Sequence, residues 1–196
     1  MKWTYFYLYA VMDVYSRKAV GWMVATRETA DLAKVLLAET IAKKNVPAKE
    51  LTIHSDNGTS MASKTVALLL ADLGVTKSHS RPHVSNDNPN SEALFKTVKY
   101  CPTFPGMFAT LTDARAFCNR FFDTYNNHHR HGGLGLLTPA VVHGGQAGLS
   151  EPSAPSSWTQ PTHGTPTASP TPPQPPRLPE PAWINRPDDS ETDTHK

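Results

Sequence analysis

Leu51-Thr-Ile-His-Ser-Asp56-Asn-Gly58 is the stretch that says most about the fold of this chain. The short run from Leu51 to Ser55 predicts a strand, and Asn57-Gly58 is typical of a turn. Open α/β sheets hold ligands just beyond the carboxyl ends of their strands, so Asp56 is well placed to bind a metal ion. The alternative, in which Asp-Asn-Gly forms only a turn, stays open on this stretch alone.

A second acidic residue, Glu92, stands in Asn88-Pro-Asn-Ser-Glu92-Ala-Leu-Phe-Lys96-Thr-Val-Lys99, with 35 residues between it and Asp56. Asn88 is the expected cap of a helix whose first residue is Pro89. Helical spacing puts one acid and two bases on one face and apolar residues on the other: Glu92, Lys96 and Lys99 against Leu94 and Val98. An ordinary surface Glu-to-Lys pair is the alternative interpretation.

Strands and helices are expected to alternate along the first 148 residues, which predicts an α/β domain. The expected elements are a β-hairpin from strands 3–14 and 19–26, a helix from Thr29 to about Lys44, the strand Leu51 to Ser55, a helix ending before Gly74, a strand from Val75 to Ser80, the helix with Glu92, and a helix from Thr112. In the last helix one stripe is apolar: Ala114, Phe117, Phe121 and Tyr125.

Composition divides the chain into a core, residues 1–148, and a proline-rich tail, residues 149–196, that is expected to be disordered. Residues 1–150 carry 16 Lys and Arg against 11 Asp and Glu, and the remainder carries 3 against 6. The mildly basic core suits a polyanionic partner. Two cysteines are too few for a disulfide framework, and no stretch predicts a membrane span, so a cytoplasmic location is expected.

Several runs together resemble the integrase and transposase superfamily with an RNase H-like fold, and most closely the transposases of bacterial insertion sequences. The resemblance covers about residues 3 to 145, with the motifs in the family's order and spacing. The matching runs are 8–22 (Leu-Tyr-Ala-Val-Met-Asp-Val-Tyr-Ser-Arg-Lys-Ala-Val-Gly-Trp), 54–58 (His-Ser-Asp-Asn-Gly), 80–89, 91–100 (Ser-Glu-Ala-Leu-Phe-Lys-Thr-Val-Lys-Tyr), and 125–131 (Tyr-Asn-Asn-His-His-Arg-His) with Thr138-Pro139.

The resemblance implies a mixed sheet flanked by helices, and DNA transposition by metal-dependent phosphodiester hydrolysis and strand transfer. Asp56 and Glu92 match the second and third acids of the family's Asp-Asp-Glu triad, which would hold Mg²⁺ or Mn²⁺. Arg81, Lys96 and Lys99 are the expected contacts to DNA phosphates. The intact family members are expected to act as homo-oligomers on element ends and target DNA.

By the same resemblance, the first acid lies in a Trp-x-Asp-x-Thr stretch on a strand that precedes the hairpin and sits in the middle of the sheet. This chain begins with Met1-Lys-Trp, roughly ten residues later. We therefore expect the sheet to lack its first strand and the chain to be inactive alone. The alternatives are a non-catalytic remnant that binds DNA or a partner, and a decayed reading frame.

Two further groups of residues are assigned structural roles. Asp13 stands beside Ser16 and Arg17 and is expected to fix the hairpin turn, so it is not taken as a substitute for the first acid. Four histidines fall close together: His128, His129, His131 and His143. Their spacing is unlike that of zinc ligands on a helix, and the resemblance places the segment 125–131 behind the active site or against DNA.

Overall fold

The computed structural model describes residues 5–44, 51–55, 61–79 and 89–148. Strands and helices alternate through the first half of the chain, and helices follow in the second half. The elements are β1 (Tyr7–Met12), β2 (Ala19–Ala25), α1 (Ala30–Lys44), β3 (Thr52–Ser55), α2 (Lys64–Asp72), β4 (Thr76–His79), α3 (Pro89–Lys99), α4 (Leu111–Asn127) and α5 (Pro139–His143). This order confirms the predicted α/β class.

The described strands form two separate ladders. β1 and β2 pair antiparallel, with Tyr7 opposite Ala25, whereas β3 and β4 pair in parallel, with Thr52 opposite Thr76. The predicted mixed sheet is thus seen as one antiparallel pair and one parallel pair. Among the described residues, no strand joins the two pairs.

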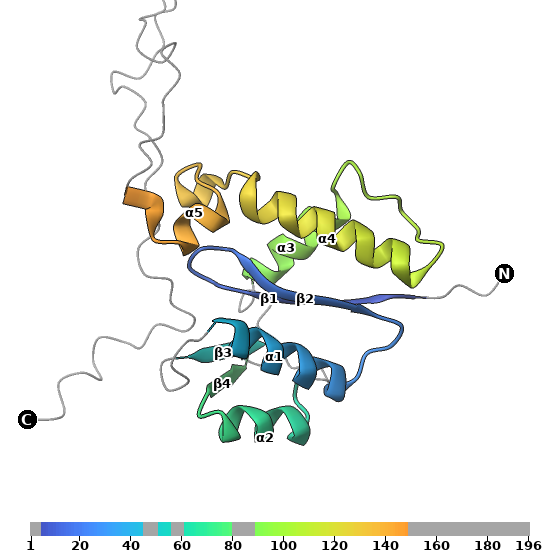
Figure 1. Cartoon of the computed structure of the whole chain (residues 1–196), viewed down its shortest axis with the longest axis vertical. Coiled ribbons are helices and arrows are strands. Elements are labelled where there is room, and N and C mark those ends of the chain that lie inside the picture. Colours follow the sequence, from blue (N-terminus) through green and yellow to red (C-terminus); the bar gives the residue numbers. More distant parts are fainter. Residues whose placement is uncertain (1–4, 45–50, 56–60, 80–88, 149–196) are drawn as a thin grey trace, which may run out of the picture.

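Side chains of β1 alternate between two hydrophobic cores, as the two-residue period of a strand requires. Leu8 and Ala10 pack with the core formed by α3 and α4, while Tyr9 and Val11 pack with the core formed by α1 and α2. Helices consequently cover both faces of the hairpin. Figure 1 shows α3, α4 and α5 on one side of the β1–β2 ribbon and α1, α2, β3 and β4 on the other.

Helix α4 packs on β2 through the stripe that the sequence predicts. Its apolar residues are buried, and they extend the core that β2 and α3 share: Ala114, Phe117, Phe121, Phe122 and Tyr125. The helix begins at Leu111 rather than at Thr112, so the predicted start is wrong by one residue. Thr110 caps the helix in a reciprocal capping box with Asp113, and this box fixes the start.

On the opposite side of the hairpin, α1 packs closely against β2. The Thr29 hydroxyl accepts a hydrogen bond from the Leu32 N–H at 3.3 Å, which confirms the predicted cap. A side chain at Gly21 would overlap the Thr40 hydroxyl of α1, so glycine is required where helix and strand meet. Gly74 follows α2 with φ of 67°, the left-handed conformation expected after a helix end.

Residues 149–196 lie outside the described residues, and the predicted disorder of the tail therefore stays a prediction. Among the helices that are described, none combines the length and the apolar character needed to cross a membrane.

Candidate functional site

Asp56 directly follows β3, which pairs in parallel with β4. β3 ends at Ser55, which is buried, and a 2.7 Å contact between His54 Nδ1 and Ser78 Oγ joins β3 to β4. Ile53 of β3 packs into the core under α2. Asp56 itself lies outside the described residues, so its distance to Glu92 stays untested.

Helix α3 carries the second acid on a well-anchored scaffold. Leu94 and Val98 are only 3% and 8% exposed and pack into the core with α4, as predicted. Glu92 lies in the first turn and is exposed. The positive end of the helix dipole favours a carboxylate there. The Glu92 carboxylate makes no ion pair with another described residue, which leaves its oxygens accessible to a ligand.

Two lysines share the exposed side of α3 with Glu92. Lys96 and Lys99 follow it by four and seven residues, and both side chains are exposed. Their ammonium groups carry positive charge along the surface that presents the Glu92 carboxylate. The predicted face of α3 is therefore present. Arg81, the other predicted DNA contact, lies outside the described residues.

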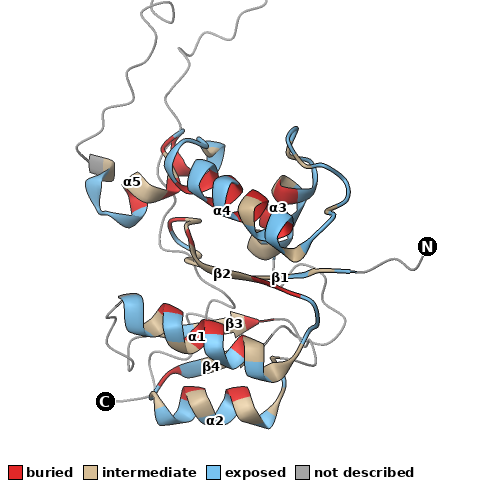
Figure 2. Ribbon diagram, turned by 45° about the vertical axis from the view of Figure 1, so that its right-hand side comes forward, coloured by how far each residue is buried: buried red, intermediate tan, exposed pale blue. Residues whose placement is uncertain are grey.

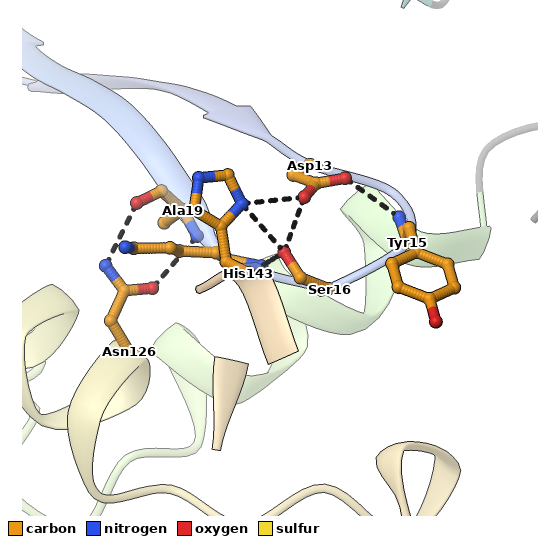
Figure 3. Close-up of polar contacts among 7 residues, drawn as sticks. Asp13, Tyr15, Ser16, Ala19, Asn126 and His143 are labelled. Carbon is orange, nitrogen blue, oxygen red and sulfur yellow. Dashed lines mark hydrogen bonds and ion pairs between the residues drawn. The ribbon is translucent and has the colours of Figure 1, made fainter. Parts of the chain in front are cut away.

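Asp13 fixes the hairpin turn, as the sequence predicts (Figure 3). Its carboxylate accepts hydrogen bonds from the Tyr15 N–H at 3.0 Å and from the Ser16 hydroxyl at 2.6 Å. His143 of α5 approaches the same carboxylate, with 2.8 Å between Nδ1 and Oδ2. Burial raises the pKa of Asp13, but the hydrogen bonds from Ser16, His143 and Tyr15 outweigh it and hold the pKa below 3.8.

Two of the other clustered histidines, His129 and His131, contact Tyr125 of α4. His129 stacks on Tyr125 with ring centroids 5.6 Å apart, and His131 meets both rings edge to face. Burial, with smaller effects from His129 and Arg17, lowers the pKa of His131 to about 4. Among the described residues, no group of three or more His, Cys, Asp or Glu side chains could hold a metal ion.

Two family models with the same description together match residues 1–139 of this chain. Residues 1–85 match a family model described as integrase core domain, and residues 73–139 match a second model with the same description. The chain belongs to the integrase core family. The resemblance that the sequence motifs indicate is confirmed. In this integrase core, Glu92, Lys96 and Lys99 fall within the second matched segment.

Relatives of this integrase core include transposases of insertion sequences. The transposase for insertion sequence element IS904 of Lactococcus lactis is 31% identical over 134 residues, which cover 68% of this chain and 53% of the relative. Transposase InsF for insertion sequence IS3A of Escherichia coli is 28% identical over 68% of this chain and 46% of its own length. The chain thus spans about half the length of these relatives.

Solved structures with the same fold come from retroviral integrases. The catalytic core domain of BIV integrase superposes with a TM-score of 0.56 at 20% identity, covering 76% of this chain and 92% of that one. A chain of the simian T-cell lymphotropic virus intasome in complex with PP2A regulatory subunit B56 gamma gives a TM-score of 0.57 at 19% identity, covering 84% of this chain and 52% of that one. At these identities the likeness establishes the fold alone, and the predicted RNase H-like class is confirmed.

Proposed function

We propose that this chain is the catalytic core of a DNA transposase, a polynucleotidyl transferase acting on phosphodiesters. The observation that carries the proposal is the exposed face of α3, where Glu92 stands beside Lys96 and Lys99 on a helix anchored by Leu94 and Val98. An acid able to bind a metal ion and two cations able to hold phosphate oxygens are among the groups that cutting and joining DNA requires. The relatedness to insertion-sequence transposases supports the same function.

The acids of this core suit divalent metal ions. Glu92 offers accessible carboxylate oxygens, and oxygen donors are what Mg²⁺ and Mn²⁺ prefer. We assign Asp56 and Glu92 as the residues that would hold Mg²⁺ or Mn²⁺. When bound, these ions supply Lewis-acid stabilisation of the attacking and leaving oxygens of a phosphodiester.

The lysines of α3 would position the DNA. Lys96 and Lys99 project from the helix that carries Glu92, so a phosphate held by them lies next to that carboxylate. Arg81 is assigned to the same role. Contacts to phosphates fix the register of DNA without reading its sequence. The partners proposed are element ends and target DNA, with a homo-oligomer in the intact transposase.

Metal-dependent DNA binding tests this function. Purified chain is titrated with a duplex carrying the DNA that flanks its coding sequence, with and without Mg²⁺ or Mn²⁺. The metal is expected to tighten binding through Asp56 and Glu92, and Asp56→Asn and Glu92→Gln are expected to remove that gain. Glu39→Gln is the matched control, because Glu39 is also an exposed helical acid with a lysine four residues on.

Two results would redirect the assignment. Salt-dependent DNA binding that is indifferent to metal, to Asp56→Ala and to Glu92→Ala favours the non-catalytic remnant. Efficient strand transfer by the chain alone would support the function while refuting the expectation that the chain is inactive alone, which stays a prediction.

A further inference from the structure

Two large aromatic side chains are exposed beside the lysines of α3. Phe95 is 43% exposed and Tyr100, directly after the helix, is 74% exposed. The Tyr100 N–H donates to the Lys96 carbonyl at 2.9 Å, so the helical path of the backbone continues to Tyr100. Exposed aromatic rings beside two exposed lysines combine flat apolar area with positive charge, which is suited to contact with a partner.

The two rings flank the charged stripe on opposite sides. At about 100° per residue, the positions around the helix relative to Glu92 are about −60° for Phe95, −20° for Lys99, +40° for Lys96 and +80° for Tyr100. Leu94 and Val98 lie on the far side, in the core. Figure 2 shows buried and exposed segments interleaved along the helices, as expected of helices that bury one face. We call the exposed set of Phe95, Lys96, Lys99 and Tyr100 the α3 surface.

The positive charge and the exposed rings of the α3 surface favour a partner that carries both negative charges and accessible aromatic groups. The ammonium group of Lys99 lies 5.6 Å from the centroid of the Tyr100 ring, so positive charge and aromatic ring are already adjacent. An apolar peptide would leave two ammonium groups facing it without counter-charges, whereas a nucleic acid supplies phosphates for the lysines and bases for the rings. Surfaces that combine these two groups bind single strands.

Stacking on an aromatic side chain also distinguishes unpaired nucleotides from base-paired DNA. Every base in a continuous duplex already stacks on both neighbours, so its faces are closed to a protein ring. Unpaired nucleotides at a DNA end present free faces, and stacking on an aromatic side chain accepts any base. We propose that the α3 surface binds unpaired nucleotides at the end of a DNA duplex, with Phe95 and Tyr100 stacking on bases and the lysines holding the flanking phosphates. This inference rests on the proposed DNA function and defines the form of DNA that the site accepts.

Binding to three matched DNA probes tests the proposal. The first is a blunt duplex, the second the same duplex with a short unpaired overhang, and the third carries an overhang of equal length whose nucleotides are abasic. The second and third probes have the same phosphates and differ only in bases. The full chain is expected to bind the overhang with bases about tenfold more tightly than the abasic overhang.

Substitutions test whether the rings of Phe95 and Tyr100 cause the preference for the overhang that carries bases. Phe95→Ala with Tyr100→Ala is expected to abolish the difference between the two overhangs, whereas Phe95→Tyr with Tyr100→Phe retains it. Tyr5→Ala is the control, because Tyr5 is 73% exposed but lies outside α3. Lys96→Ala with Lys99→Ala should weaken all three probes alike, since phosphate contacts do not depend on bases.

Four outcomes would overturn the inference. Equal affinity for the two overhangs, or a preference that survives the double aromatic substitution, rules out stacking while leaving the proposed DNA function intact. A double aromatic substitution that changes the oligomeric state and leaves DNA binding unchanged shows that the rings contact another copy of the chain. Absence of salt-dependent binding to every probe removes both the inference and the proposed function.

Discussion

Asn126 of α4 binds both backbone polar groups of Ala19 in β2, although the two residues are 107 positions apart. The side-chain amide accepts from the Ala19 N–H and donates to the Ala19 carbonyl, each at 2.9 Å, as Figure 3 shows. Both residues are buried, at 7% and 1% exposure. The amide thus takes the place of a neighbouring strand and joins α4 to the hairpin.

Removal of this amide is expected to destabilise the fold. Asn126→Ala leaves a buried N–H and a buried carbonyl without partners, which costs about 2 to 4 kcal/mol. Urea denaturation measures the loss. Asn127→Ala is the control, because Asn127 is exposed and its side chain donates to the exposed Asp123; it should change stability by less than about 0.5 kcal/mol. An equal effect of the two substitutions would contradict the role of Asn126.

The Asp13 carboxylate should make stability fall in strong acid. Its pKa is held below 3.8 in the folded protein, so the unfolded chain takes up the proton first as the pH falls. The stabilisation is complete well above pH 3.8 and is lost as the pH drops through the folded value. Asp13→Asn removes this dependence in a series of denaturation curves below about pH 5, whereas Asp123→Asn on α4 should leave it in place.

His131 should contribute a second pH dependence, in a higher window. Burial lowers its pKa from 6.5 to about 4, so the folded protein keeps the ring neutral while the unfolded chain protonates it. Stability is therefore greatest above pH 6.5 and declines as the pH falls toward 4. His131→Phe keeps a ring against Tyr125 and cannot titrate. The expected result is a flatter stability profile between pH 6.5 and 4, with His128→Gln as the exposed control; an unchanged slope in His131→Phe would refute the assignment.

The lysines of α3 should set the salt dependence of DNA binding. The logarithm of the affinity falls as the logarithm of the salt concentration rises, and each phosphate contact that is lost reduces the steepness of this fall by about one. Lys96→Ala and Lys99→Ala are each expected to show this decrease in anisotropy titrations at several salt concentrations. Lys43→Ala on α1, where Lys43 pairs with Glu39 at 3.7 Å, should leave the slope unchanged. If all three variants behave alike, the face of α3 is no DNA contact.

Local sequence signals predict most of the elements and both faces of α3. The Thr29 cap, the Phe117 stripe and the burial of Leu94 and Val98 follow from spacing and capping, because these depend on residues within one or two turns. The start of α4 was also within reach, since Thr110 and Asp113 form the pattern of a capping box. A start at Thr112 does not use this pattern, which places the cap two residues earlier.

Long-range contacts could not be predicted in the same way. Asn126 is one of several polar residues on α4, and nothing near it in sequence indicates a partner on β2. The pairing of His143 with Asp13, 130 positions apart, likewise depends on how α5 docks against the hairpin turn. The exposure of Phe95 had a local signal, because its position borders the Glu92 face of the helix, but an aromatic residue there is equally compatible with a wider core stripe.

The central claim is that Asp56 and Glu92 bind the same divalent metal ions, and calorimetric titration of the chain with Mn²⁺ tests it most directly. Asp56→Asn, Glu92→Gln and the double variant are compared with Glu39→Gln. We expect each single variant to lose most of the Mn²⁺ affinity, the double variant to be no weaker than the singles, and Glu39→Gln to match the unmodified chain. Mn²⁺ binding that is unchanged in either single variant would contradict the claim.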